Sequence, residues 1–300
     1  MEVKNTVEPQ PDTLGITGLL HSVINVGRDI LARRRRDTAQ SPSSGLVDKC
    51  TQLLHHRGEA SGLALACEVV DDYRKLDEEN RILFFEALSQ QFSVDSDEVV
   101  AAAQQYQEST TGEHLMRLSK AIEAPRVKLF RRMNMAPNAT PTLVKMRGEL
   151  LRLRKTHPDL QVVEADLKQL FISWFNRGFL QLSVIDWQSP AAVLERIIRY
   201  ESVHAITGWD DLRSRLSDNR MCFAFFHPTM PDDPLVFVEV AITAGTPAAI
   251  GPIIEKTNEP SDASELDTVV FYSISNCHPG LAGVSFGNFL IKQVVKEVGK

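Results

Sequence analysis

Apolar residues recur every three to four positions through most of the first 175 residues. This spacing places apolar side chains on one face of a helix, and short polar connections between such stretches are typical of an antiparallel bundle. The pattern predicts helices over residues 14–36, 46–57, 61–75, 77–92, 113–130, 142–155 and 160–174, with a further helix beginning near Asp95. Residues 1–13 are expected to be a disordered lead-in.

Short motifs predict where several helices begin and end. Asp95-Ser-Asp-Glu98 and Thr110-Thr-Gly-Glu113 each place a side-chain acceptor before a helix and a carboxylate three residues later, which is the pattern of a helix N-terminus. Thr207-Gly-Trp-Asp210 has the same pattern. Pro125 is expected to kink or break its helix, because proline lacks the N–H that the helix needs. Segment 40–45, which contains Ser, Pro and Gly, is expected to be a loop.

After Gly178 the pattern changes to alternating and continuous apolar runs that are rich in β-branched and aromatic residues. Strands are predicted over 221–226, 235–242 and 268–274, a short strand or extended connection over 179–185, and helices over 190–200 and 210–216. The Pro- and Asp-rich segment 227–234 is expected to be a hairpin loop, so its two flanking strands are predicted to be antiparallel neighbours. This element order is that of a GNAT-like acetyltransferase fold. The predicted class is α+β, with a helical domain over 1–175 and an incomplete GNAT-like mixed α/β domain over 176–300.

The last predicted strand is followed by a segment with glycines at 280, 283 and 287. After these glycines the apolar residues recur at helical spacing. A helix N-terminus presents unpaired N–H groups and the positive end of the helix dipole, both of which favour an anion. Because Gly283 and Gly287 lack a Cβ, a diphosphate could approach the backbone closely. The alternative is that these glycines only allow close packing at a helix entry, and the spacing leaves both interpretations open.

Charge and cysteine content narrow the class of partner and the compartment. The net charge of −6 offers no attractive field for nucleic acid or an anionic membrane, so neither is expected as a partner. The arginines at 33–36 are interpreted as a solvated helix end rather than a binding patch for an anionic partner. The four cysteines at 50, 67, 222 and 277 have neither metal-site nor disulfide-framework spacing, which favours free thiols in the cytoplasm. No signal peptide, membrane span or metal site is expected.

Several longer strings in the second half resemble the malonyl-CoA decarboxylase family. They are Tyr-Glu-Ser-Val-His-Ala-Ile-Thr-Gly-Trp at 200–209, Asp-Pro-Leu-Val-Phe-Val-Glu-Val-Ala-Ile-Thr at 233–243, Phe-Tyr-Ser-Ile-Ser at 271–275 and Gly-Leu-Ala-Gly-Val-Ser-Phe-Gly-Asn-Phe-Leu-Ile-Lys at 280–292. The resemblance implies a helical domain involved in homo-oligomerisation, followed by a GNAT-like catalytic domain. It also implies release of CO₂ from malonyl-CoA to give acetyl-CoA, with acyl-CoA as the substrate and no separate cofactor.

The same resemblance assigns site residues. The family's acyl-CoA-binding loop falls on seven consecutive positions: Ala282, Gly283, Val284, Ser285, Phe286, Gly287 and Asn288. The family's catalytic serine and histidine belong to segments that would follow Lys300, so no catalytic residue is expected within this chain. We therefore expect a truncated member of the family with little activity alone.

Three alternatives stay open. The chain is also consistent with an acyl-CoA-dependent acyltransferase, because a diphosphate-binding loop does not specify the chemistry at the thioester. It is consistent as well with a non-catalytic helical assembly module. Within the chain, His278 with Ser275 or Ser285 forms a conceivable nucleophile–base pair, although Ser275 is more simply a strand-end residue bonded to local backbone. The three tryptophans are expected to anchor the core or a domain interface.

Overall fold

The computed structural model describes residues 13–32, 42–217, 219–254, 266–284, 286 and 289–299. The fold is α+β, as predicted: a helical part precedes a part that contains a four-stranded antiparallel sheet. The chain divides into two compact units, one of residues 1–142 with 157–163 and the other of residues 143–156 with 164–300. The domain boundary near residue 175 stays a prediction.

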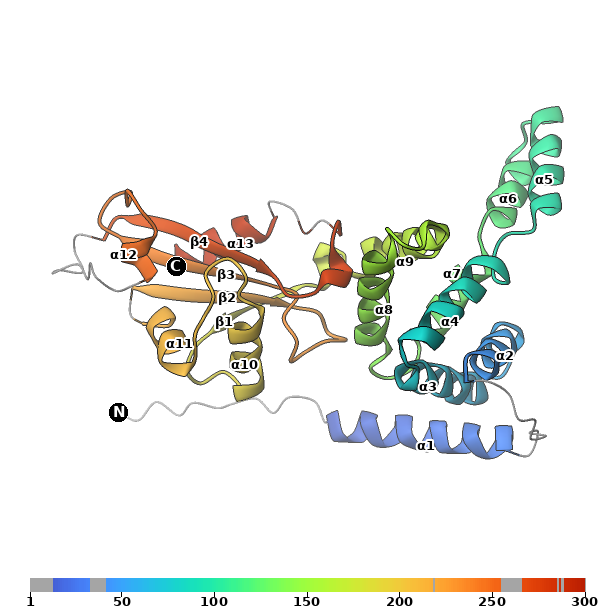
Figure 1. Ribbon diagram of the computed structural model, residues 1–300, viewed down its shortest axis with the longest axis horizontal. Helices are drawn as coiled ribbons and strands as arrows, with labels where there is room; N and C mark the ends of the chain where they lie inside the picture. The colour runs from blue at the N-terminus through green and yellow to red at the C-terminus, as the bar shows by residue number, and fades with distance from the viewer. Residues whose placement is uncertain are drawn as a thin grey trace, which may run out of the picture. The chain divides into compact units, whose positions relative to one another are not determined.

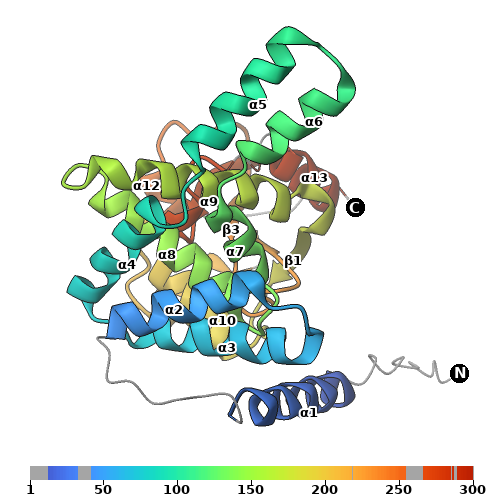
Figure 2. The same cartoon turned by 90° about the vertical axis from the view of Figure 1, so that its right-hand side faces the viewer.

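The first unit is helical (Figures 1 and 2). Its elements are α1 Thr13–Ala32, α2 Pro42–His55, α3 Glu59–Lys75, α4 Glu78–Gln90, α5 Ser96–Glu108, α6 Gly112–Ala121, α7 Pro125–Met133, the start of α8 Ala139–Leu153, and the 3₁₀ turn η1 Pro158–Leu160. Buried aromatic rings of α3 and α4 pack together: the ring centroid of Tyr73 lies 5.6 Å from that of Phe84 and 6.2 Å from that of Phe85. The antiparallel pair α5 and α6 lies side by side in both figures.

The helix starts confirm one predicted cap and correct two others. Asp95 accepts hydrogen bonds from the amides of Asp97 and Glu98, as predicted. The cap of α6 is Thr111, whose hydroxyl accepts from the amide of His114, so the pattern starts one residue later than the motif at 110–113 indicates. At α11 the side chain that reaches back is Asp211 instead of Asp210, because the helix begins after Gly208.

Prolines mark helix starts in this unit. Pro125 ends the predicted helix over 113–130 and opens α7 as its first residue, because the first turn of a helix leaves its N–H groups without intrahelical partners. The expected loop over 40–45 is wrong from Pro42 onward, where α2 begins for the same reason. The predicted lead-in up to residue 12 and the arginine run at 33–36 lie outside the described residues.

The second unit contains the rest of α8, most of α9 Gln161–Trp174, and the sheet. Its remaining elements are the 3₁₀ turn η2 Arg177–Phe179, β1 Gln181–Ile185, α10 Ala191–Tyr200, α11 Trp209–Arg215, β2 Arg220–Phe226, β3 Val236–Thr243, α12 Gly251–Ile254, β4 Thr268–Asn276, the 3₁₀ turn η4 Pro279–Leu281 and α13 Phe289–Val298. The strand order is β1-β2-β3-β4 and all three pairings are antiparallel, which confirms the predicted hairpin between β2 and β3. The pairing of β3 with β4 shifts its register between Glu239 and Val240.

One face of this sheet packs against α10 and α11, which Figure 1 draws together on the same side of the strands. The buried apolar cluster there joins strand residues such as Cys222 and Phe237 to Ile197 of α10 and Leu212 of α11. β2 and β3 are almost continuously buried, whereas β4 is only partly covered. The loop that follows β4 thus leaves a sheet whose central strands are buried.

Two tryptophans lie at the surface, so the expectation of a core position for them is wrong. Trp187 is 46% exposed and Trp209 is 44% exposed. Their rings meet edge to face with centroids 6.1 Å apart, and the guanidinium of Arg213 lies 4.8 Å from the Trp187 centroid. Mutual packing and a cation–π contact cover part of each ring without burial in the core. In the part of the chain that the structure describes, no helix has the length and apolar character needed to cross a membrane.

Candidate functional site

The segment between β4 and α13 turns sharply twice within the described residues. Pro279–Leu281 forms a 3₁₀ turn, and Gly283 then adopts a φ of +70°. This left-handed conformation favours glycine because a Cβ would be strained there. The predicted strand, glycine-rich loop and helix are therefore present in that order. The three residues Ser285, Gly287 and Asn288 of the predicted site lie outside the described residues.

Of the described residues of the predicted loop, two are buried and two are exposed. Val284 and Phe286 are each 7% exposed, so their side chains are part of the core. Ala282 and Gly283 are exposed. Any ligand in front of this loop would consequently meet backbone at 282 and 283, while the apolar side chains at 284 and 286 hold the loop to the fold.

Gly280 serves close packing, which is the simpler of the two interpretations of the glycines. A Cβ added at Gly280 would lie 1.8 Å from the carbonyl oxygen of Val144 in α8, a distance that no real Cβ tolerates. From the other side, a Cβ on Gly148 would lie 3.4 Å from the Gly280 amide nitrogen. The turn thus rests directly on the backbone of α8.

Arg147 of α8 fixes the same turn by hydrogen bonds. Its side chain is 1% exposed, and its Nη1 and Nη2 donate to the carbonyl oxygens of Gly280 (2.5 Å) and Ala282 (2.8 Å). Its Nε and Nη2 donate to Glu164 Oε1 of α9, at 2.9 Å and 2.6 Å. A buried guanidinium needs such partners, because an unpaired buried charge is costly. The arginine ties α8, α9 and the loop into one polar cluster.

Lys168 lies one helical turn after Glu164 and faces Gly283. A Cβ built on Gly283 would lie 3.3 Å from Lys168 Nζ and 3.4 Å from Lys168 Cε. Arg147, Glu164 and Lys168 are not among the site residues predicted from the sequence. A signal for the first was present: Arg147 falls at helical spacing among Leu143, Val144 and Leu150, where an apolar residue is expected.

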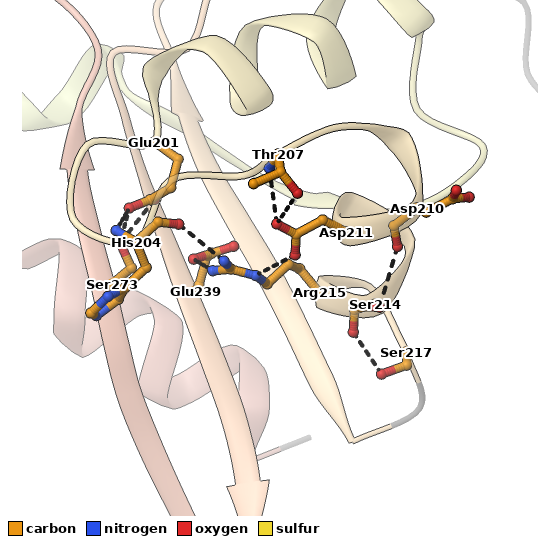
Figure 3. Close-up of polar contacts among 10 residues, drawn as sticks. All are labelled: Glu201, His204, Thr207, Asp210, Asp211, Ser214, Arg215, Ser217, Glu239 and Ser273. Atoms are coloured by element: carbon orange, nitrogen blue, oxygen red, sulfur yellow. Dashed lines mark hydrogen bonds and ion pairs between the residues drawn. The ribbon is translucent and has the colours of Figure 1, made fainter. Parts of the chain in front are cut away.

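A second polar cluster lies between the sheet and the helices α10 and α11 (Figure 3). Arg215 and Glu239 are 1% and 0% exposed, and Arg215 Nη1 donates to Glu239 Oε2 at 3.1 Å. Arg215 also pairs with Asp211 and donates to the His204 carbonyl. Burial raises the pKa of Glu239 to about 7, and the nearby Glu201 adds to this rise while Arg215 opposes it.

Glu201 organises the neighbouring part of this cluster. Its carboxylate accepts from the hydroxyls of Ser273 and Ser275, at 2.9–3.0 Å, and from the amides of Val203 and His204. The expectation that Ser275 bonds to local backbone is therefore wrong: its hydroxyl reaches a residue 74 positions earlier in the sequence. The pairing of β4 in the sheet places its serines beside the segment that follows α10. This contact cannot be predicted from the residues next to Ser275 in the sequence.

His278 and His227 each lie beside polar groups of other residues. His278 Nε2 lies 3.6 Å from Asp233 Oδ1, and burial lowers the pKa of His278 although Asp233 opposes the shift. His227 lies between the Trp174 carbonyl and the Thr229 hydroxyl. Ser275 is committed to Glu201, so the described residues hold no Ser275–His278 pair. Nor do the described side chains gather three or more His, Cys, Asp and Glu in a group that could hold a metal ion.

Comparison with known proteins covers both parts of the chain. Residues 92–175 match the family model of the malonyl-CoA decarboxylase N-terminal domain, and residues 178–300 match that of the malonyl-CoA decarboxylase C-terminal domain. Together the two models account for more than half of the chain. This chain belongs to the malonyl-CoA decarboxylase family. The resemblance stated from the sequence is confirmed.

Individual relatives agree with this family assignment. The mitochondrial malonyl-CoA decarboxylases of Anser anser anser and Rattus norvegicus are 36% and 35% identical over 178 residues, which is 57% of this chain and 35% and 36% of theirs. The crystal structures of malonyl-CoA decarboxylase from Rhodopseudomonas palustris and Agrobacterium vitis are 49% and 47% identical, each with a TM-score of 0.80. Each of these alignments covers 85% of this chain and 62% of the solved one. The chain thus spans about a third of the length of the curated relatives.

Proposed function

We propose that this chain contributes the acyl-CoA-binding part of a carboxy-lyase of its family, which converts malonyl-CoA to acetyl-CoA and CO₂. In this proposal the loop of Ala282, Gly283, Val284, Ser285, Phe286, Gly287 and Asn288 binds the phosphates of the acyl-CoA substrate. The observation that carries the proposal is the family match at 178–300, which includes this loop. The left-handed Gly283, exposed beside a lysine side chain, supports the same assignment.

The chemistry defines what the binding loop contributes. Loss of CO₂ from malonyl-CoA leaves an enolate at the thioester, which needs oriented donors at its oxygen and an acid to protonate its carbon. A phosphate-binding loop supplies neither group, but it fixes one end of a long substrate and so reduces the freedom of the reacting end. Since Ser275 is bonded to Glu201, we do not assign the proton transfer to Ser275 and His278.

Two measurements test the proposal on the full chain. A calorimetric titration with malonyl-CoA should give saturable heat, and a flat trace at millimolar ligand would contradict coenzyme binding. Product analysis by chromatography and mass spectrometry identifies the reaction. Acetyl-CoA and CO₂ formed from malonyl-CoA support the decarboxylase, whereas free CoA released from acetyl-CoA only when an amine is present would indicate the acyltransferase.

We further propose that the helical part forms homo-oligomers. Large apolar side chains of the α5–α6 pair are exposed, among them Leu115 at 47% and Met116 at 68%. Burial of such side chains against another copy would remove apolar surface from water. Light scattering on the full chain should give a mass above 33.5 kDa, and Met116→Lys should lower it. A monomer at all concentrations would contradict the proposal and also the idea of a purely structural assembly module.

A cytoplasmic location is the last part of this proposal. All four cysteines are buried and unpaired, which suits a reducing compartment. The curated relatives carry the word mitochondrial in their names. Fractionation of cells that contain the protein decides between the two: recovery with an organelle fraction would contradict the cytoplasmic assignment.

A further inference from the structure

The proposed acyl-CoA-binding loop, residues 282–288, is called the coenzyme loop below. It contains no lysine or arginine. From residue 266 to residue 291 the sequence contains neither lysine nor arginine, and the next basic residue is Lys292 in α13. Backbone amides and a helix dipole attract phosphate, but a charge-assisted hydrogen bond from a cationic side chain is about twice as strong as a neutral one. If the loop binds the phosphates of acyl-CoA as proposed above, a cation that strengthens this binding has to come from another element.

A cationic side chain from α9, that of Lys168, lies beside the loop. Glu164 and Lys168 are four residues apart on that helix and therefore lie on the same face. Glu164 holds Arg147, and Arg147 donates to the carbonyls of Gly280 and Ala282. These buried hydrogen bonds fix the position of this face of α9 against the loop. Lys168 is the next side chain along the face, and it arrives beside Gly283.

The ammonium of Lys168 stands where a ligand at the loop would meet it. Its Nζ lies 3.3 Å from the point at which a Gly283 side chain would begin. Gly283 is exposed and Lys168 is half-buried. A lysine in such a position generally covers its aliphatic part and keeps its charge near the surface. Among the described residues, no carboxylate pairs with Lys168. A partly buried lysine next to a left-handed glycine, without an acidic partner, has the chemistry of a phosphate contact.

We propose that Lys168 binds a phosphate of the acyl-CoA substrate and supplies the positive charge that the loop lacks. The proposal rests on the function proposed above. It adds a residue 115 positions before Gly283, on a helix that the loop motif does not include. Two phosphate groups of coenzyme A have this chemistry, the diphosphate and the 3′-phosphate. Because the glycine loop is assigned to the diphosphate, we expect Lys168 to contact the diphosphate.

The test uses the full chain and three substitutions. Lys168→Met removes the charge and keeps the aliphatic length, Lys168→Arg keeps the charge, and Lys296→Met removes an exposed charge near the end of α13. Calorimetric titration with CoA should show roughly tenfold weaker binding for Lys168→Met, which is the loss of one hydrogen bond to a charged group. Lys168→Arg should lose less, and Lys296→Met should bind like the wild type. Unfolding midpoints in urea verify that all three variants fold.

The ligand series separates the possible results. With 3′-dephospho-CoA, persistence of the Lys168→Met defect supports contact with the diphosphate, and its disappearance supports contact with the 3′-phosphate instead. Equal affinity of folded Lys168→Met and wild type for CoA would overturn the assignment of Lys168 alone. If the wild type does not bind CoA, the proposed function fails, and this inference fails with it.

Discussion

Arg147 and Ala282 are 135 residues apart in the sequence and are joined by a 2.8 Å hydrogen bond from the guanidinium Nη2 to the carbonyl oxygen. The same guanidinium pairs with Glu164 and leaves almost no surface exposed. Removal of one partner of a buried pair leaves the other charge without compensation. The position of the turn before the coenzyme loop therefore depends on a side chain from α8.

Arg147→Met is expected to destabilise the second unit by about 3 kcal/mol, because it leaves Glu164 and two carbonyl groups without their donor. All three tryptophans, Trp174, Trp187 and Trp209, belong to this unit. Tryptophan fluorescence during urea unfolding consequently reports on it without a contribution from the first unit. Arg154→Met, at an exposed arginine just after the end of the same helix, is the matched control and should change the unfolding midpoint little. Equal effects of the two changes would refute the role given to Arg147.

Gly280→Ala is expected to disrupt the turn more than Gly148→Ala does, although both glycines lie at the same contact. The new Cβ at 280 would collide with the Val144 carbonyl at 1.8 Å, and two backbone segments would have to separate. The Cβ at 148 would lie 3.4 Å from its nearest neighbour, within ordinary contact range. A fluorescence-monitored melt should show a large drop in midpoint for the first variant and a small change for the second. A small change in both would mean that the packing of α8 on the loop is looser than this geometry requires.

Stability of the second unit should fall as the pH rises from about 4.5 to about 7, because of Glu239. Burial raises the pKa of Glu239 from an ordinary 4.5 to about 7, so between these values the folded state retains a proton that the unfolded state has released. Each pKa unit corresponds to roughly 1.4 kcal/mol, so the difference between 4.5 and about 7 sets the expected decline at roughly 3–4 kcal/mol.

The Glu239→Gln variant provides the measurement. It cannot ionise, so the difference in unfolding free energy between it and the wild type should shift in favour of the variant as the pH rises through this window. Glu195→Gln, at an exposed position of α10, should leave the pH dependence as it is in the wild type. If the difference between Glu239→Gln and wild type is the same at pH 4.5 and pH 8, the raised pKa of Glu239 is wrong.

The cysteines should be unreactive in the folded protein. Burial raises the pKa of Cys50, Cys222 and Cys277 above that of an ordinary thiol, and a protonated, inaccessible thiol is a poor nucleophile. Ellman's reagent should modify these three slowly, with Cys67, 9% exposed, reacting first. In guanidinium chloride all four should react at once. Rapid stoichiometric labelling of Cys222 in the native protein would contradict the packing of the sheet against α10.

The sequence predicted those elements whose signals are local. Apolar spacing located most of the helices, β-branched runs located β2, β3 and β4, and the cap at Asp95 was correct because an N-cap depends on a few neighbouring residues. Thr111 and Asp211 were missed by one position, since two adjacent residues can each serve as the cap or the returning carboxylate and packing selects between them. Specific strings identified the family, which the two family models confirm.

What the amino-acid order determined by itself is thus the α+β class, the strand–glycine–helix unit and the family, because each depends on residues close together in the chain. The tertiary structure decided which distant side chains meet: Arg147 on the carbonyls of Gly280 and Ala282, Glu201 on Ser273 and Ser275, and Lys168 beside Gly283. Helical spacing marks Arg147 as a charge on an apolar face, but it does not name a partner more than 130 residues away. Only the packing of α8 and α9 against the loop does so, because a buried charge takes whichever partner the fold brings within reach.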